Sequence, residues 1–166
     1  LDEFSQMRLA GGTSLALQMG HRISVDLDFF GEIDFSQINM TKCFSNLESV
    51  STLKRSENIN IFEFNGVKVD FVNYQYPWLK EELVFENIRL ASKEDIAAMK
   101  IAAIIGRGTR KDFIDLFFLL KEFNITEIVS FFEKKYFDAS PMLALKSLTY
   151  FEDAERNPLT NQIIPV

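Results

Sequence analysis

Cysteine and histidine are nearly absent from this chain, which has one of each among its 166 residues. Cys43 has no second cysteine to pair with, and with His21 it cannot complete the ligand set of a structural zinc site. The lack of a disulfide framework favours a reducing compartment. There is also no signal peptide and no apolar run near the roughly 20 residues that a membrane-spanning helix needs. We therefore expect a cytoplasmic protein without a membrane partner.

Positive charge is also scarce, with 18 Lys and Arg against 24 Asp and Glu and a net charge of −6. This balance argues against a broadly basic surface that binds nucleic acid indiscriminately, although it leaves room for a local basic patch. Hydrophobic residues make up 47% of the chain, as in ordinary globular proteins. The length fits one domain, and 17 phenylalanines predict a core rich in aromatic rings.

The first half of the chain reads as mixed α/β. Apolar alternation and turn residues predict strands over residues 6–10, 25–30, 59–64, 67–74 and 88–91. Gly11 and Gly12 are expected to turn into a short helix capped by Thr13. A second helix is expected over residues 35–50, with Cys43 as an inert packed thiol.

A hairpin and a change of character divide the chain. Asn65-Gly66 predicts a type I′ turn, because both residues tolerate positive φ. From Ser92, the expected cap of the next segment, helices are expected over residues 96–105, 110–123, 126–137 and 141–153. Thr109 is the expected cap and Asn124 the expected end of the second of these. We expect residues 1–91 to form an α/β core and residues 92–166 a helical part packed against it as one compact unit.

The rings between residues 113 and 123 recur at helical spacing, which predicts core packing and not a platform for stacking bases.

Two aspartates share one face of the strand expected over residues 25–30. Asp26 and Asp28 are two residues apart, so both side chains project from the same side. The other side is expected to carry Val25, Leu27 and Phe29. Two adjacent carboxylates resist full ionisation unless a cation compensates them, and a divalent metal is the simplest occupant. Asp70 is a further charge on an otherwise apolar strand end.

Each of these features has a plainer interpretation when it is taken alone. Gly11-Gly12 fits an ordinary tight turn, and the aspartates fit a solvated strand face. Together, Gly11-Gly12-Thr13, Asp26-x-Asp28 and a later strand with Asp70 resemble the nucleotidyltransferase pattern of the polymerase β-like superfamily. In that superfamily the glycine turn holds the nucleotide phosphates and the first two carboxylates bind metal, while the third helps to bind the catalytic metal and to activate the attacking hydroxyl.

The closer resemblance is to the AbiEii/AbiGii-type toxin family, nucleotidyltransferase-like proteins of bacterial type IV toxin–antitoxin systems. It rests on residues 11–17, residues 21–30, Lys100-x-x-Ala103, Arg107-Gly108, Arg110-Lys111-Asp112-x-x-Asp115 and Tyr150-Phe151-x-Asp153-Ala154-Glu155. The resemblance implies an α+β fold, with a nucleotidyltransferase-like mixed β-sheet, flanking helices and a helical C-terminal part, and a cleft between the two parts.

The resemblance also implies a function. It points to transfer of a nucleotide from an NTP with Mg²⁺ in a two-metal site formed by Asp26, Asp28 and Asp70. The phosphates would be held by Gly11, Gly12, Thr13 and Lys100. The 3′ end of a tRNA is one acceptor that it suggests, and a cognate antitoxin protein would restrain the toxin. Two metals between nucleophile and leaving group stabilise both oxygens of an in-line displacement, so the chemistry agrees with the resemblance.

Charged residues of the helical half are candidates for the same site. Lys100 and Arg107 are seven residues apart, about two helical turns, so they can share one face and meet a triphosphate. Asp112 is expected to support catalysis from the helical side. A solvated, salt-bridged face is the plainer interpretation of such a charge run, and Arg107, Arg110 and Asp115 fit a role in organising the loop between two helices.

The roles of three residues before Asp28, and the identity of the acceptor, stay open. Arg22 is a good phosphate candidate, whereas His21, at the end of a short helix, fits a partner of the helix dipole better than a ligand contact. Ser24 fits either a phosphate contact or the end of a turn. A catalytically silent nucleotide-binding protein, and a transferase that modifies a small molecule or a protein, remain alternatives. The presence of all three carboxylates argues against the silent protein. The acidic net charge leaves the transferase that modifies a small molecule or a protein open as an alternative.

Overall fold

The computed structural model describes residues 2–149. Within them the strands form one seven-stranded sheet in the order β3-β4-β5-β2-β1-β7-β6. The strands are β1 (Arg8–Ala10), β2 (Leu27–Gly31), β3 (Val50–Lys54), β4 (Ile59–Phe64), β5 (Val67–Asn73), β6 (Leu83–Phe85) and β7 (Ile88–Leu90). The pairs β1–β7 and β2–β5 are parallel and the others antiparallel. The predicted α+β class with a mixed sheet is confirmed.

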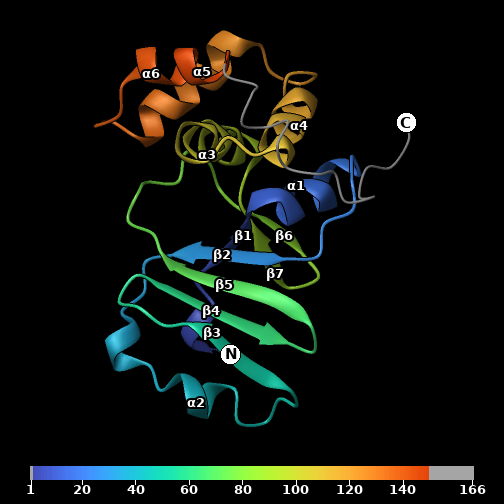
Figure 1. Cartoon of the computed structure of the whole chain (residues 1–166), viewed down its shortest axis with the longest axis vertical. Coiled ribbons are helices and arrows are strands. Elements are labelled where there is room, and N and C mark those ends of the chain that lie inside the picture. The colour runs from blue at the N-terminus through green and yellow to red at the C-terminus, as the bar shows by residue number, and fades with distance from the viewer. Residues whose placement is uncertain (1, 150–166) are drawn as a thin grey trace.

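The described residues also form six α-helices. These are α1 (Gly11–Met19), α2 (Met40–Cys43), α3 (Lys93–Gly106), α4 (Arg110–Leu119), α5 (Ile125–Lys135) and α6 (Pro141–Ser147). Figure 1 shows the sheet in the middle of the molecule, with α3 to α6 gathered beyond one end and α2 beyond the other. None of the helices in residues 2–149 has the length and apolar character to cross a membrane.

The β4–β5 hairpin is confirmed at its predicted turn. Asn65 and Gly66 have φ values of 49° and 83°, as a type I′ turn requires. β5 then runs parallel to β2, and the register of the two strands places Asp70 directly beside Asp28. The hairpin therefore brings Asp70 next to Asp28.

The helix predicted over residues 35–50 is wrong. The segment contains a short 3₁₀ turn at Phe35–Gln37 and the single turn of α2, and Val50 begins β3. The side chains of Asp34 and Asn39 accept hydrogen bonds from backbone N–H groups and so cap two separate turns. Local capping breaks the helical stripe, and Cys43 ends a turn with its thiol half-buried, where burial raises the pKa of that thiol.

Several predicted boundaries also move. β2 begins at Leu27, so Val25 precedes it and is 55% exposed instead of facing the core. α1 begins at Gly11 with Ala10 at the cap position, and Thr13 does not cap it. Asn124 does not end α4 but opens α5, in a capping box with Glu127. β6 was not predicted, because its three residues are all exposed and show no alternation.

The C-terminal end of the expected last helix, and the Tyr150 to Glu155 motif, lie outside the described residues.

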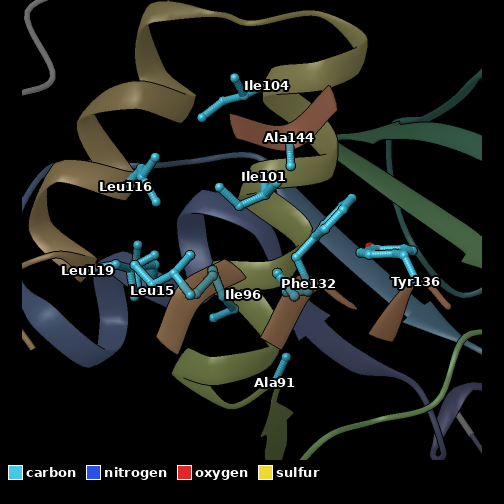
Figure 2. Packing of buried hydrophobic residues seen from close by; sticks show 14 of the residues in the cluster. Leu15, Ala91, Ile96, Ile101, Ile104, Leu116, Leu119, Phe132, Tyr136 and Ala144 are labelled. Carbon is cyan, nitrogen blue, oxygen red and sulfur yellow. The ribbon is translucent and has the colours of Figure 1, made fainter. Parts of the chain in front are cut away.

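Two hydrophobic clusters hold the fold together. The larger joins β1 and α1 to the four later helices, and Figure 2 shows Leu15, Ile96, Leu116, Phe132 and Ala144 pointing into it. The smaller lies around α2, β4 and β5 and is rich in rings; Phe44 packs edge-on against Phe62 at a centroid distance of 5.0 Å. The prediction of ring-rich packing is thus confirmed there.

The apolar run on α4 is only partly core, so the prediction for residues 113–123 is partly wrong. Leu116 and Leu119 are buried, but Phe117 is 59% exposed and Leu120 41% exposed. Both line an apolar groove between α4, α5 and α6. Helical spacing alone did not show that this helix presents a second apolar face to the surface.

Candidate active site

A cleft of about 490 Å³ gathers charged residues from both halves of the chain. It is lined by Gly12, Arg22, Ser24, Asp26, Asp28, Lys68, Asp70, Lys100, Arg107, Thr109, Arg110, Lys111 and Asp112. Nine of the eleven residues predicted to bind the nucleotide, hold metal or act in catalysis are among them. Gly11 and Thr13 are not, and Lys68 is a lining residue that the sequence interpretation missed. Because Lys68 lies two positions before Asp70 on a strand, the period of two was the signal that could have found it.

One wall of the cleft is made of carboxylates. Asp28 on β2 and Asp70 on β5 are neighbours in register, and Asp26 lies just before β2 on the exposed side. Burial, together with the charge of Asp70, raises the pKa of Asp28, while Lys68 and Lys100 act in the opposite direction. The carboxylate pair therefore holds unfavourable negative charge that a cation would relieve.

Lys68 supplies part of that compensation. Its Nζ lies 2.6 Å from Oδ1 of Asp70. This oxygen is buried and accepts no well-formed hydrogen bond, so the contact is an ion pair without good hydrogen-bond geometry.

The two glycines make room for side chains of the site. Gly11 has a φ of 64°, and a Cβ there would lie 2.6 Å from Oδ2 of Asp28. A Cβ on Gly12 would lie 1.7 Å from Nη2 of Arg22, a distance that no structure tolerates. The Gly-Gly sequence therefore leaves room for the side chains of Asp28 and Arg22 in the positions that they take against the start of α1.

A second wall is a buried network of opposite charges on α3 and α4. Nζ of Lys100 lies 3.0 Å from Oδ1 of Asp112 and 2.6 Å from Oδ2 of Asp115. Arg107 donates from Nε and Nη2 to Asp112 at 3.1 and 3.2 Å, and Thr109 Oγ1 donates to it at 2.6 Å. The side chain of Arg107 is 67% exposed, whereas Asp112 is fully buried, so the arginine extends from a fixed anchor into solvent.

The two aspartates of this network stay ionised. Burial alone would raise the pKa of Asp112, but Lys100 and hydrogen bonds from Arg107 and Thr109 hold it below its ordinary value. Burial opposes ionisation of Asp115 as well, and hydrogen bonds from His21 and Arg22 with the charge of Lys100 outweigh it and depress the pKa of Asp115. Thr109, predicted as a cap, uses its side chain for Asp112 instead of a backbone N–H.

Arg22 and His21 reach the same network from the loop after α1. Arg22 donates from Nε and Nη2 to the two oxygens of Asp115 at 2.7 and 3.0 Å, a bidentate pair. Nε2 of His21 lies 2.7 Å from Oδ1 of Asp115, and its ring packs on Phe118 at a centroid distance of 5.0 Å. The end of α1 is closed by Gly20, and His21 bonds a carboxylate instead of acting as a dipole partner.

Thr13 and Ser24 shape the loop that carries Asp26. The Thr13 hydroxyl donates to the backbone carbonyl of Asp26 and lies 2.8 Å from the Ser24 hydroxyl. Thr13 is buried, so it holds this loop from behind, while Ser24 lines the cleft.

Two other hollows of the described residues have different chemistry. One of about 620 Å³ is lined by Glu32, Asp34 and Glu57 and by neutral residues, with no basic side chain. The groove on α4, about 440 Å³, is lined by apolar residues alone. Neither suits a phosphate, whereas the cleft brings cations and carboxylates together.

The carboxylate wall fits a divalent cation by its chemistry. Within residues 2–149, no group of three Asp, Glu, His or Cys side chains is arranged to hold a metal ion. Mg²⁺ is commonly held by one or two carboxylates with substrate phosphates and water completing the octahedron. Asp28 and Asp70 in register, with Oδ1 of Asp70 buried and lacking a hydrogen bond, fit that mode.

Sequence comparisons agree with this chemistry. Residues 1–163 match the family model for "Nucleotidyl transferase AbiEii toxin, Type IV TA system". An uncharacterised protein of Aquifex aeolicus, aq_aa25, is 40% identical over 152 residues, which cover 88% of this chain and 74% of that protein.

Solved structures are similar in fold. JHP933 from Helicobacter pylori has a TM-score of 0.55 at 21% identity, over 87% of this chain and 81% of its own. A putative nucleotidyltransferase from H. pylori gives 0.54 at 21% identity, over 87% and 84%. The Megavirus polyadenylate synthase gives 0.51 at 13% identity, over 72% of this chain and 29% of its own. At these identities the likeness concerns the fold.

Proposed function

The chain belongs to the AbiEii nucleotidyl transferase toxin family, and from that premise we propose that the cleft transfers a nucleotide from an NTP to an acceptor hydroxyl with the help of Mg²⁺. The observation that carries the proposal is the arrangement of the cleft, in which the paired Asp28 and Asp70 line the same hollow as the cations of α3 and its following loop. Phosphate and divalent metal both find suitable partners there.

The triphosphate is assigned to the basic wall. Lys100, Arg107 and Arg22 supply three positive charges, and Asp112 and Asp115 supply two negative charges, which leaves one positive charge in the network. Arg107 is largely exposed and Lys100 lines the cleft, so both can meet phosphate oxygens. Asp112 positions both cations, which agrees with its assignment as a supporting residue of the helical side.

Gly12 and Ser24 line the cleft, where they can contribute to nucleotide binding. Gly11 and Thr13 do not line it and act indirectly, Gly11 by admitting Asp28 and Thr13 by holding the loop of Asp26.

The transfer itself forms a bond between the acceptor oxygen and the α-phosphorus and breaks the bond from that phosphorus to the bridging oxygen, releasing pyrophosphate. Asp70 takes the proton of the acceptor hydroxyl, and Asp26, Asp28 and Asp70 would hold the metal. When bound, Mg²⁺ supplies charge stabilisation for the attacking and leaving oxygens. Lys100 and Arg107 hold the β- and γ-phosphates and so orient the leaving group.

The proposal extends to an acceptor and a protein partner. We propose the 3′ end of a tRNA as acceptor, since exposed Arg107, Arg110 and Lys111 give the rim of the cleft a basic character that the whole acidic chain lacks. A cognate antitoxin is the proposed partner, because the family is one of toxin–antitoxin systems.

The test is incubation of the protein with each α-³²P-labelled NTP, Mg²⁺ and total bacterial RNA. Asp28→Ala is compared with Glu63→Ala, which removes an exposed carboxylate of the same sheet outside the cleft. We expect label in tRNA with the wild type and Glu63→Ala, at least about a hundredfold less with Asp28→Ala, and none without Mg²⁺. Nuclease mapping locates the label at the 3′ end.

Label in protein or in a small molecule, with none in RNA, would contradict the tRNA acceptor and keep the transferase. No label in any fraction would contradict the transfer itself.

A further inference from the structure

Lys68 is a lining residue of the cleft to which the proposed reaction gives no role. It lies on β5 two residues before Asp70, so both side chains project from the same face of the sheet. Its Nζ lies 2.6 Å from Oδ1 of Asp70, and its side chain is 40% exposed. A positive charge thus sits at the carboxylate that the reaction requires.

Lys68 differs from Lys100 in how firmly it is held. Lys100 is 6% exposed and lies between two carboxylates that are themselves buried. Lys68 has one ion-pair partner in the described part of the chain, and that contact lacks good hydrogen-bond geometry. A long, half-exposed side chain with one electrostatic contact can leave it at low cost, whereas Lys100 cannot move without exposing buried charge.

The ammonium group of Lys68 occupies the position beside Asp70 that a divalent cation would take. Oδ1 of Asp70 is buried and lies 2.6 Å from Nζ of Lys68, so a metal ion that binds this oxygen must take the place of the ammonium group. The neighbouring Asp28 shares the same wall and the same need for positive charge.

We propose that Lys68 is a resident counter-ion of the Asp28–Asp70 pair, which a divalent cation must displace and which therefore weakens metal binding until nucleotide phosphates bring the metal in. The inference rests on the proposed function only in taking these aspartates as metal ligands. It makes Lys68 a positioning residue that couples metal entry to the nucleotide.

The test measures binding of Mn²⁺ alone, without nucleotide, from the electron paramagnetic resonance signal of the free ion. Lys68→Met is expected to tighten Mn²⁺ binding about tenfold, the lower end of the range by which groups around metal ligands change metal affinity. Lys111→Met is the matched control, because Lys111 lines the same cleft and makes no ion pair among the described residues. Removing its charge should change the affinity by no more than about threefold.

Two further variants separate displacement from a change of structure. Lys68→Arg keeps the charge and should keep the weak binding, and Asp70→Asn in the Lys68→Met background should remove the gain. Lys68→Gln repeats the first measurement with a polar side chain if the Met variant folds poorly.

Equal Mn²⁺ affinities of Lys68→Met and the wild type, or an equal gain in Lys111→Met, would overturn the inference about Lys68. The proposed function has a separate readout in the wild type with Mn²⁺ and a non-hydrolysable NTP. Absence of bound Mn²⁺ there would contradict the metal site itself, whereas its presence together with unchanged Lys68→Met affinity would contradict the counter-ion alone.

Discussion

Helix α3 carries one member of each of two buried charge networks, and the two networks differ in balance and in access. At its first turn Asp95 accepts a hydrogen bond from Nζ of Lys135 at 2.7 Å, and both side chains are fully buried. Nζ also donates to the carbonyl of Pro77 at 2.7 Å and lies 4.4 Å from the ring centre of Trp78. One cation meets one anion, and aromatic rings cover the pair.

The second network, five residues further along α3, is neither balanced nor covered. Lys100 joins Arg22 and Arg107 around Asp112 and Asp115, and the cations line the cleft. Burial lowers the pKa of Lys135 against the opposing charge of Asp95, whereas the pKa of Arg107 is raised by its hydrogen bonds to Asp112. A balanced, covered pair ties segments together; an open network with a surplus cation can accept an anion.

The largest effect on stability is expected at the covered pair. Lys135→Met leaves Asp95 as a buried charge without its cation and should lower the free energy of unfolding by about 3–5 kcal/mol. Lys134→Met, its exposed neighbour on α5, should stay within about 0.5 kcal/mol of the wild type. Urea unfolding measures both.

At a temperature where Lys135→Met is folded, its transfer activity per folded molecule should equal that of the wild type. A selective loss of activity in the folded variant would break the distinction between the two networks.

A smaller loss of stability with a large loss of activity is expected at the open network. In Gly12→Ala the new Cβ would lie 1.7 Å from Nη2 of Arg22, so the guanidinium must leave Asp115 or α1 must shift. We expect a loss of about 1–3 kcal/mol and about a hundredfold lower kcat/KM. Gly20→Ala meets no atom within 4 Å and tests backbone strain alone, because Gly20 has a φ of 63°.

Gly20→Ala should lose about 1 kcal/mol of stability and keep its activity. Equal activity in the two variants would show that the position of the Arg22 guanidinium group does not affect transfer.

The smallest expected effect has the opposite sign. Burial raises the pKa of Asp28 in the folded chain, so the wild type loses stability as the pH rises through that folded value, and the cost is absent well below the unfolded value. Asp28→Asn should therefore raise the stability at pH 7 by about 1 kcal/mol and abolish transfer. Near pH 3 the gain should vanish, since Asp28 is then protonated in both states.

Asp34 is the matched control for this change. Hydrogen bonds from Ser36 and Gln37 lower the pKa of Asp34, so Asp34→Asn should lower the thermal midpoint at pH 7. Thermal midpoints of both variants at the two pH values check the signs, and a decrease for Asp28→Asn at pH 7 would contradict the account of a strained carboxylate pair.

The parts of the fold that the sequence predicted best are those with local causes. Asn65-Gly66 allows positive φ at both positions, so the hairpin followed from two residues. Asp26, Asp28, Asp70 and Lys100, which line the cleft, were also singled out, because the family resemblance added to what strand and helix periods indicated. The helix predicted over residues 35–50 was wrong, because capping side chains competed with the helical pattern.

The parts of the structure that were not predicted from the sequence depend on contacts between distant segments. Lys135 lies 40 residues from Asp95, and nothing near either one in sequence indicates that they meet. Asp115 likewise gathers Arg22 and His21 from 93 and 94 residues away. Pairing of this kind follows from how helices pack, which local periodicity does not report.

Binding of a non-hydrolysable nucleoside triphosphate in the presence of Mg²⁺ tests most directly whether the open network holds phosphate. Calorimetry compares the wild type, Lys100→Met and Lys111→Met, with circular dichroism as the check of folding. The account predicts at least about a tenfold higher Kd for Lys100→Met, the cost of one charge-assisted hydrogen bond, and a smaller change for Lys111→Met. Equal Kd values for the wild type and a folded Lys100→Met would contradict it.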